Sequence, residues 1–203
     1  MELIGERWSL LIVRELIFGP RRFSDLRASL PGMSAKVLTE RLATLEGSGV
    51  LMKRRLPPPT AAQVYELTEW GYEAEPMIQE LGRWAAKSSQ HDPTLPLSPV
   101  SFLLSLRTMF DPRKAGSWRT RMGFRFPDIS FVADLAEGKM AVTRTEPEEC
   151  DAVFVASAGP PLAALFYVGM SPDQAGVGIE GDPGSAARFV ELFELPEKIG
   201  GRD

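Results

Sequence analysis

The sequence predicts an α+β protein with two domains, and three observations of pattern support this. In the first 90 of its 203 residues, helical apolar patterns run into the pattern of a basic β-hairpin. After residue 119, alternating apolar segments are interspersed with helical ones, which is typical of an α+β domain with a mostly antiparallel sheet. Between them, three prolines among residues 91–99 are typical of an interdomain linker. We therefore predict domains over residues 1–90 and 100–203, joined by a linker over 91–99.

Composition is that of a soluble globular protein, because 44% hydrophobic and 25% charged residues are ordinary values for this class. No apolar run approaches the ~18 residues of a membrane span. The acidic start Met1-Glu2 does not resemble a signal peptide. A single cysteine cannot form an internal disulfide, which suits a reducing compartment. We expect a cytoplasmic protein with no membrane partner.

Three helices are predicted in the first part of the chain. Trp8 to Phe18 is a strongly apolar helical segment that ends at Gly19-Pro20. Arg22 to Leu30 carries its apolar residues on one helical face and predicts a second, shorter helix. After a Pro-Gly turn, Ser34 is a favourable N-cap for a third helix, because its hydroxyl can accept a hydrogen bond from a first-turn amide.

The third helix is expected to have a buried side and an outer side. Its leucines at positions 38, 42 and 45 are spaced four and three apart and lie on one face. Lys36, Glu40 and Ala43 lie on the opposite face. Because apolar and polar residues lie on opposite faces, we predict an amphipathic helix with a polar outer surface.

A basic β-hairpin is predicted directly after this helix. Its strands are Val50 to Leu56 and Gln63 to Leu67, and the first strand carries Lys53-Arg54-Arg55. Thr68 can then cap a long helix that runs to Ala86 with an interruption near Pro76. An amphipathic helix beside a cationic hairpin is the shape of a winged helix, which places the helix in a major groove and the hairpin against neighbouring phosphates. The pattern therefore predicts a winged-helix DNA-binding domain.

The distribution of charge agrees with this interpretation, although the whole chain has a net charge of −4. From Arg7 to Arg55 there are ten Lys and Arg residues against four Asp and Glu residues. Residues 90–203 carry eleven against sixteen. Attraction of phosphates needs only a local positive field, which the first part supplies. The acidic second half should repel DNA and must have another role.

The second half predicts a helix over Val100 to Phe110, followed by strands and two more helices. A Glu137-Gly138 turn between two of the strands predicts a hairpin. The expected strands are Arg119–Phe126, Ile129–Leu135, Lys139–Thr145, Asp151–Ala156 and Val177–Glu180, and the expected helices are Leu162–Gly169 and Ser185–Phe193.

Four blocks of the first part closely resemble HxlR-type transcriptional regulators. They are Ile4 to Leu16, Gly19 to Leu26, Lys36 to Leu42 and Tyr65 to Gly71, and they occur in family order over residues 1–86. The resemblance implies a MarR/HxlR-like winged helix-turn-helix, a homodimer and sequence-specific binding of double-stranded DNA at a pseudo-palindromic operator. Repression is the outcome expected of such a compact regulator.

One departure from the family concerns the start of the chain. HxlR regulators usually carry more residues before the segment that matches Ile4-Gly5, often with a cysteine used in oxidant sensing. Here Met1 stands almost at that point. Either the start is naturally short or upstream residues are missing, and redox sensing by the family route is not expected.

The second half is similar, more weakly, to the sterol carrier protein domain. The similarity rests on Asp128 to Phe131, Asp134 to Lys139, Asp151 to Phe154 and Gly181-Asp182. It implies a sterol carrier protein-like fold around an apolar tunnel, and hence an effector-binding or dimerisation domain for a hydrophobic small molecule. Nine of eleven phenylalanines lie in this half, where they would line a tunnel or equally well form a packed core. The ligand-binding candidates are Phe102, Phe110, Phe124, Phe126, Phe131, Phe154 and Phe166.

The major-groove candidates are Ser34, Lys36, Thr39, Glu40 and Arg41 on the third helix. Lys36 could donate to guanine acceptors, and Glu40 could accept from N4 of cytosine. The alternative is a solvated helix face whose charges serve solubility.

Four arginines are candidates for phosphate contacts: Arg21 and Arg22 before the second helix, and Arg54 and Arg55 in the hairpin. Adjacent strand residues point to opposite faces. Both hairpin arginines therefore cannot face DNA equally, and we expect one to pack inward or to pair with an acid.

No catalytic residue, metal site or cofactor is predicted. His91 is the single histidine and falls in the linker, and Cys150 stands among carboxylates that disfavour a thiolate. Gly176 to Gly181 spells a dinucleotide-binding fingerprint, but Asp182-Pro183-Gly184 follows where a helix should open at once. A turn-rich strand boundary explains these glycines better.

The leading hypothesis is a cytoplasmic, homodimeric transcriptional repressor controlled by a hydrophobic effector. The alternative is a lipid-binding or carrier protein whose first half is a degenerate winged-helix docking module, although the positive front segment argues against it. An enzyme acting on a hydrophobic substrate ranks last, because no nucleophile–base pair is visible in the sequence.

Overall fold

The computed structural model describes residues 5–58, 61–90 and 95–199, and the chain divides into two compact units, Met1–Ile78 and Gln79–Asp203. We call them unit 1 and unit 2. The predicted linker over 91–99 lies partly outside the described residues, as does His91, so the predicted domain limits stay a prediction. Within the described ranges, no helix combines the length and the apolar character that crossing a membrane requires.

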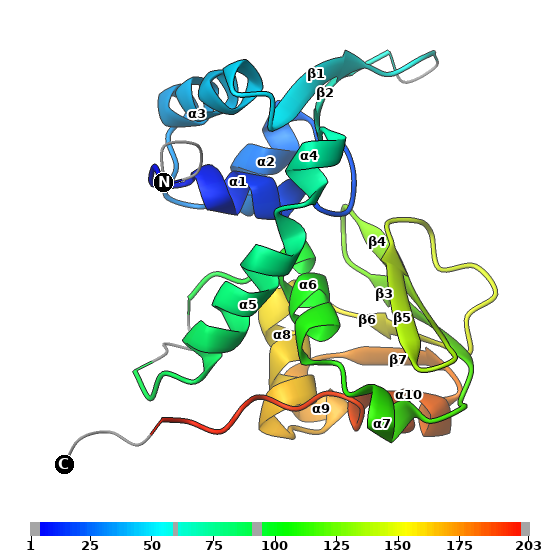
Figure 1. Cartoon of the computed structure of the whole chain (residues 1–203). Helices are drawn as coiled ribbons and strands as arrows, with labels where there is room; N and C mark the ends of the chain where they lie inside the picture. The colour runs from blue at the N-terminus through cyan, green and yellow to red at the C-terminus, as the bar shows by residue number, and fades with distance from the viewer. Residues whose placement is uncertain (1–4, 59–60, 91–94, 200–203) are drawn as a thin grey trace. The chain divides into compact units, whose positions relative to one another are not determined.

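Unit 1 begins with three helices: α1 (Ser9–Leu16), α2 (Phe23–Ser29) and α3 (Ala35–Gly47) (Figure 1). Gly19, just after α1, has a φ of 105°, a conformation that glycine adopts without strain. The Ser34 hydroxyl accepts a 3.2 Å hydrogen bond from the Val37 amide, so Ser34 is the N-cap of α3 as predicted. The two predicted helices before it are present, each shorter by one or two residues at its ends.

A hairpin and two further helices follow along the chain, and the last of them continues beyond Ile78, where unit 1 ends: β1 (Leu51–Arg55), β2 (Gln63–Leu67), α4 (Glu69–Tyr72) and α5 (Glu75–Ala86). β1 and β2 pair antiparallel as predicted. The helix expected up to Ala86 is interrupted between α4 and α5. Pro76 lies in the first turn of α5, where a missing amide hydrogen is tolerated.

The hairpin is tied to the loop between α1 and α2. The Arg21 amide donates a 2.9 Å hydrogen bond to the Tyr65 carbonyl, and the Tyr65 amide donates one of 2.8 Å back. Apolar side chains of the helices and the hairpin fill the space between them, among them the three leucines predicted to be buried. The core includes Ile12, Val13, Leu16, Leu26, Leu38, Leu42, Leu45, Val64 and Leu67.

Unit 2 contains a sheet with the strand order β5-β4-β3-β6-β7. Of its four pairings, only that of β3 with β6 is parallel, which confirms the predicted mostly antiparallel sheet. The turn residues Glu137 and Gly138 both have positive φ, 53° and 68°, as a type I′ hairpin requires. The strands are β3 (Thr120–Arg125), β4 (Ser130–Ala136), β5 (Lys139–Thr143), β6 (Ala152–Val155) and β7 (Gly178–Gly181).

The helices of unit 2 differ more from expectation. Two single-turn helices, α7 and α9, are not among the predicted elements, because one turn is too short to show a helical period. The helix expected over Leu162–Gly169 begins earlier, and its second half is the π-helix η1. The helices are α6 (Pro99–Met109), α7 (Pro112–Ala115), α8 (Gly159–Ala163), η1 (Ala164–Val168), α9 (Pro172–Ala175) and α10 (Pro183–Val190).

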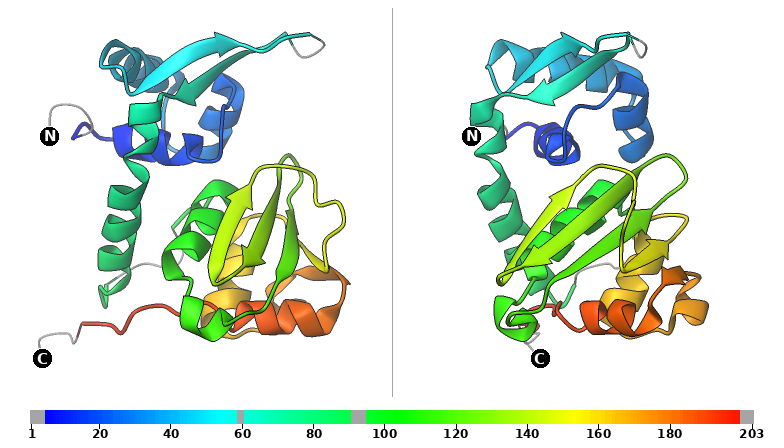
Figure 2. Two further views of the ribbon diagram at one scale, coloured as in Figure 1. Left: turned by 45° about the vertical axis from the view of Figure 1, so that its right-hand side comes forward. Right: turned by 90° about the vertical axis from the view of Figure 1, so that its right-hand side faces the viewer.

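In unit 2, helices cover one face of the sheet (Figure 2). A cluster of buried aromatic rings forms the centre of this unit. Ring centroids in this cluster lie 5.0 to 6.3 Å apart, which is the spacing of rings in contact. The cluster joins β3, β6, α6, η1 and α10 and consists of Phe102, Phe124, Phe154, Phe166, Phe189 and Phe193.

Gly71 tests the packing of unit 1, because a Cβ there would overlap the carbonyl oxygen of Val50. We expect Gly71→Ala to lower the free energy of unfolding by about 3 kcal/mol, since a backbone atom must move to relieve the overlap. Gly47→Ala is the matched control, because a Cβ at Gly47 meets nothing within 4 Å. Urea unfolding followed by circular dichroism measures both, and equal midpoints for the two variants would contradict the packing described.

Candidate nucleic-acid interface

The outer face of α3 is open to solvent. The side chain of Lys36 is 86% exposed, and Thr39, Glu40 and Ala43 are exposed beside it. Lys36 Nζ lies 3.9 Å from Glu40 Oε1, a loose pair that leaves both groups available. The Thr39 hydroxyl donates a 2.9 Å hydrogen bond to the Ala35 carbonyl and retains acceptor capacity. These side chains form a polar surface of the size that a major groove admits.

Arg41 lies at the side of this surface and not on it. Its side chain is 24% exposed, and its guanidinium pairs with Glu6 at 3.2 Å. Ser34 is committed to capping α3 but is itself exposed. Of the five predicted major-groove residues, Lys36, Thr39 and Glu40 therefore share the open face, while the other two flank it.

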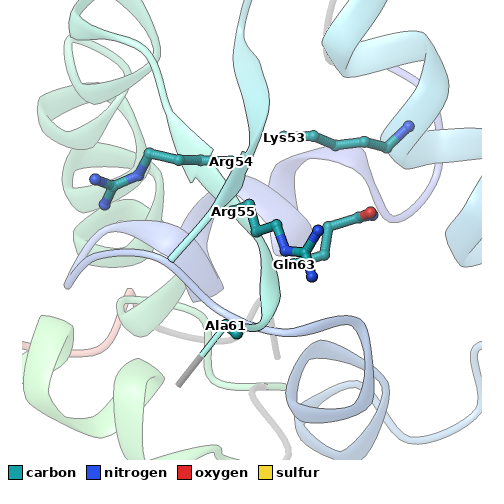
Figure 3. A pocket seen from close by; sticks show the side chains of 5 residues that line it. All are labelled: Lys53, Arg54, Arg55, Ala61 and Gln63. Carbon is teal, nitrogen blue, oxygen red and sulfur yellow. The ribbon is translucent and has the colours of Figure 1, made fainter. Parts of the chain in front are cut away.

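The register of the hairpin divides its basic residues between two faces. Arg54 lies on the face of Val64 and Glu66, and its guanidinium pairs with Glu66 at 2.7 Å. Lys53 and Arg55 lie on the opposite face, as Figure 3 shows. Arg54 is therefore the hairpin arginine that pairs with an acid, as we expected of one of the two.

Arg55 stands opposite Gln63 near the free end of the hairpin. It is exposed, and it forms no ion pair or hydrogen bond with any residue of the described part of the chain. The two side chains line an open depression of about 400 Å³ together with Lys53, Arg54 and Ala61 (Figure 3). Of its three basic lining residues, Lys53 and Arg54 are paired with carboxylates, and Arg55 supplies the unpaired positive charge.

Lys53 is a basic residue of the hairpin that is absent from the predicted contacts. Its Nζ lies 2.8 Å from Glu46 Oε2 in the last turn of α3 and 5.8 Å from the centre of the Tyr65 ring. The hydrogen bond with Glu46 raises the pKa of Lys53 above its ordinary value. In the sequence, only the run Lys53-Arg54-Arg55 marks Lys53 as a candidate, because its contacts with Glu46 and Tyr65 depend on the fold.

The two arginines before α2 differ in position. Arg22 is exposed. Arg21 is 9% exposed, and its guanidinium donates hydrogen bonds to the Ser29 hydroxyl at 3.1 Å and to the Asp25 carbonyl at 3.4 Å. Its charge is thus directed toward α2, a position that does not suit the predicted phosphate contact.

The predicted ligand-binding phenylalanines of unit 2 do not all belong to the ring cluster. Phe102, Phe124, Phe154 and Phe166 belong to the ring cluster and are at most 4% exposed. Phe126 and Phe131 form a separate pair with centroids 6.3 Å apart, and Phe110 contacts Phe193. Contacts of this kind favour the packed core over an open tunnel for the six buried rings.

In the described part of the chain, the metal-ligating residue types, Cys150 and the glycines of residues 176–181 do not form a functional site. Within the described ranges, no three His, Cys, Asp or Glu side chains are grouped so that they could hold a metal. Burial raises the pKa of the Cys150 thiol, which disfavours the thiolate. Gly178 and Gly181 bound a strand that pairs antiparallel with β6, and the dinucleotide fingerprint requires a different, βαβ setting.

A capped helix with an open polar face, preceded by two packed helices and followed by a cationic hairpin, defines a winged helix-turn-helix module. A profile of the HxlR-like helix-turn-helix family matches residues 3–93 of this chain. The chain is 40% identical over 88 residues to the HTH-type transcriptional regulator YvaP of Bacillus subtilis (strain 168), covering 43% of this chain and 81% of YvaP. It is 37% identical over 83 residues to the HTH-type transcriptional regulator YodB of the same organism, covering 41% of this chain and 74% of YodB.

The solved structure of reduced YodB superposes with a TM-score of 0.40 at 35% identity, covering 44% of this chain and 89% of that one. The family profile and the sequence relatives show that the chain belongs to the HxlR-like helix-turn-helix family. It is a DNA-binding transcriptional regulator, with a winged helix-turn-helix of the MarR/HxlR type at its N-terminal end.

Proposed function

We propose that this regulator binds a pseudo-palindromic operator as a homodimer and acts as a repressor whose second unit senses a hydrophobic molecule. The observation that carries the DNA-binding part is the open face of α3 beside the unpaired cationic residue Arg55 of the hairpin. A major groove accepts a helix of this size, and the hairpin then lies near the backbone of the adjoining segment.

Base contacts are assigned to the face of α3. Lys36 donates to guanine O6 or N7, Glu40 accepts from cytosine N4, and Thr39 serves either base type. The separation of 3.9 Å between Lys36 and Glu40 supports this, because a loosely paired lysine loses little when it exchanges a carboxylate for a base. Ser34 contributes chiefly by capping the first turn of α3. Arg41 lies beside the open face, where its guanidinium pairs with Glu6.

Phosphate contacts are assigned first to Arg55 and Arg22, which are both exposed. Arg54 is assigned a weaker contact, because its guanidinium is already paired with Glu66. We place Arg21 in the framework, where its side chain holds α2 and its backbone holds β2.

The homodimer is assigned to an exposed apolar stripe on α5. Met77, Leu81 and Trp84, spaced four and three apart, are 48%, 45% and 68% exposed. Large apolar side chains in a row on one helix face are typical of a protein–protein contact. Two copies joined by a two-fold axis would present their α3 helices about 34–36 Å apart, one turn of DNA.

The role of unit 2 is that of a sterol carrier protein-like sensor. Its support is a sheet covered on one face by helices around an aromatic centre, in a unit distinct from the winged helix. An apolar effector would have to separate rings now in contact, which couples its binding to a change in unit 2. A coupling of ~1–3 kcal/mol would change operator affinity about 5- to 150-fold.

Genomic selection of bound DNA tests the proposal as a whole. We expect the chain to enrich fragments that share a two-fold symmetric sequence, and a variant with Lys36→Ala and Arg54→Ala to enrich none. For the selected operator, Arg55→Ala should reduce the slope of log affinity against log salt by about one unit per protomer, with a smaller change for Arg54→Ala. Enrichment without a shared motif, or an unchanged slope for Arg55→Ala, would count against the assignment.

The dimer is tested by placing a charge in the stripe. Leu81→Glu should convert the dimer to a monomer in analytical ultracentrifugation and weaken operator binding, because two half-sites are then bound independently. Leu195→Glu is the matched control, since Leu195 is 38% exposed and lies outside α5. A dimer that survives Leu81→Glu and Trp84→Glu together would locate the contact elsewhere.

Effector control is tested with the protein purified from its host. Native mass spectrometry should detect a bound apolar molecule, and a total lipid extract should change operator affinity at least about fivefold. A chain that carries no such molecule and an operator complex indifferent to the extract would refute this part and leave the DNA-binding part intact.

A further inference from the structure

Beyond the apolar core that they share, the hairpin and α3 are joined at two points. The first is the chain itself, in which residues 48–50 connect the end of α3 to β1, with Gly49 at a φ of 75°. The second is the ion pair of 2.8 Å between Glu46 in α3 and Lys53 in β1. The ion pair adds a directional contact to the packing of the shared core and so opposes a change in the angle between the hairpin and α3.

The lysine of this pair is held from a second side by the Tyr65 ring. Lys53 and Tyr65 are opposite one another in the register, and the ammonium lies 5.8 Å from the ring centre. Tyr65 is 7% exposed, and its backbone is fixed by the two hydrogen bonds with Arg21. The ammonium is therefore held between a carboxylate of α3 and a ring that is anchored to the loop before α2.

The carboxylate of Glu46 weakens the electrostatic attraction of this surface for DNA. Glu46 lies beside a hairpin that is assigned to phosphates, where a negative charge repels DNA. Glu66 offers a comparison, because it also neutralises a basic residue of the hairpin, Arg54, but lies within the hairpin itself. Of these two carboxylates, Glu46 is the one that connects the hairpin to α3.

We infer that Glu46 and Lys53 are positioning residues, which fix the angle of the hairpin to α3 so that Arg55 and the face of α3 reach DNA together. This inference rests on the proposed function. Lys53 keeps its partner Glu46 when DNA is bound and is not itself a phosphate contact. The free cationic residue of that face, Arg55, makes the phosphate contact.

The experiment compares the removal of two carboxylates from the 203-residue chain. Glu46→Gln should lower affinity for the selected operator about threefold to fivefold, the range that a half-exposed ion pair supports, whereas Glu66→Gln should leave it unchanged or raise it. Lys53→Gln should lower affinity by the same factor as Glu46→Gln without changing the salt slope. The double variant Glu46→Lys/Lys53→Glu exchanges the two charges and keeps the pair, so its operator affinity should lie within about twofold of that of the wild type.

Two outcomes would overturn the inference. If Glu46→Gln binds more tightly than the wild type, the carboxylate only repels DNA. If Lys53→Gln reduces the salt slope by about one unit, Lys53 contacts phosphate. Thermal unfolding of each variant ensures that a folded protein is compared. Failure of the proposed function is distinct, because the wild type would then select no operator.

Discussion

The backbone pairing of Arg21 with Tyr65 is the interaction on which the DNA-binding surface depends. Its two hydrogen bonds of 2.9 and 2.8 Å turn the hairpin from a two-stranded ribbon, which is marginal alone, into part of the helix-turn-helix. Side chains along a strand point alternately to its two faces. Because Tyr65 is fixed, the face on which every other hairpin side chain lies is fixed as well. Arg55 is then presented on one face and Arg54 on the other. The same pairing anchors the ring against which Lys53 lies.

Much of the fold could be predicted because its signals are local. Ser34 caps α3 through an amide three residues away, and the leucines of α3 follow one helical period. Glu137-Gly138 specifies its own hairpin turn. Such features need only neighbouring residues, and the structure has each of them. Helices of one turn and the π-helix η1 leave no periodic trace, so sequence reasoning misses them.

The candidate site was less accessible to prediction, because its partners are distant in sequence. Arg54 meets Glu66 and Lys53 meets Glu46 only through the strand register and the angle of the hairpin to α3. Arg21 resembles Arg22 in sequence, yet the strand bridge directs one inward and leaves the other exposed. In unit 2 the same limit applies to the phenylalanines. Composition indicates an aromatic interior, and only the ring contacts distinguish a packed centre from a cavity.

The pairing of charges bears on how such a regulator discriminates among DNA sequences. Residues 5–78, outside the gap at 59–60, contain ten basic side chains and nine acidic ones, so the positive field arises from placement and not from excess. Glu6, Glu46 and Glu66 each neutralise a basic side chain close to the proposed interface. Basic side chains that a carboxylate already neutralises contribute less to counterion release, and so less to the attraction to arbitrary DNA. Discrimination then depends on base contacts from α3, whose usefulness requires that the hairpin and the helix hold one fixed geometry.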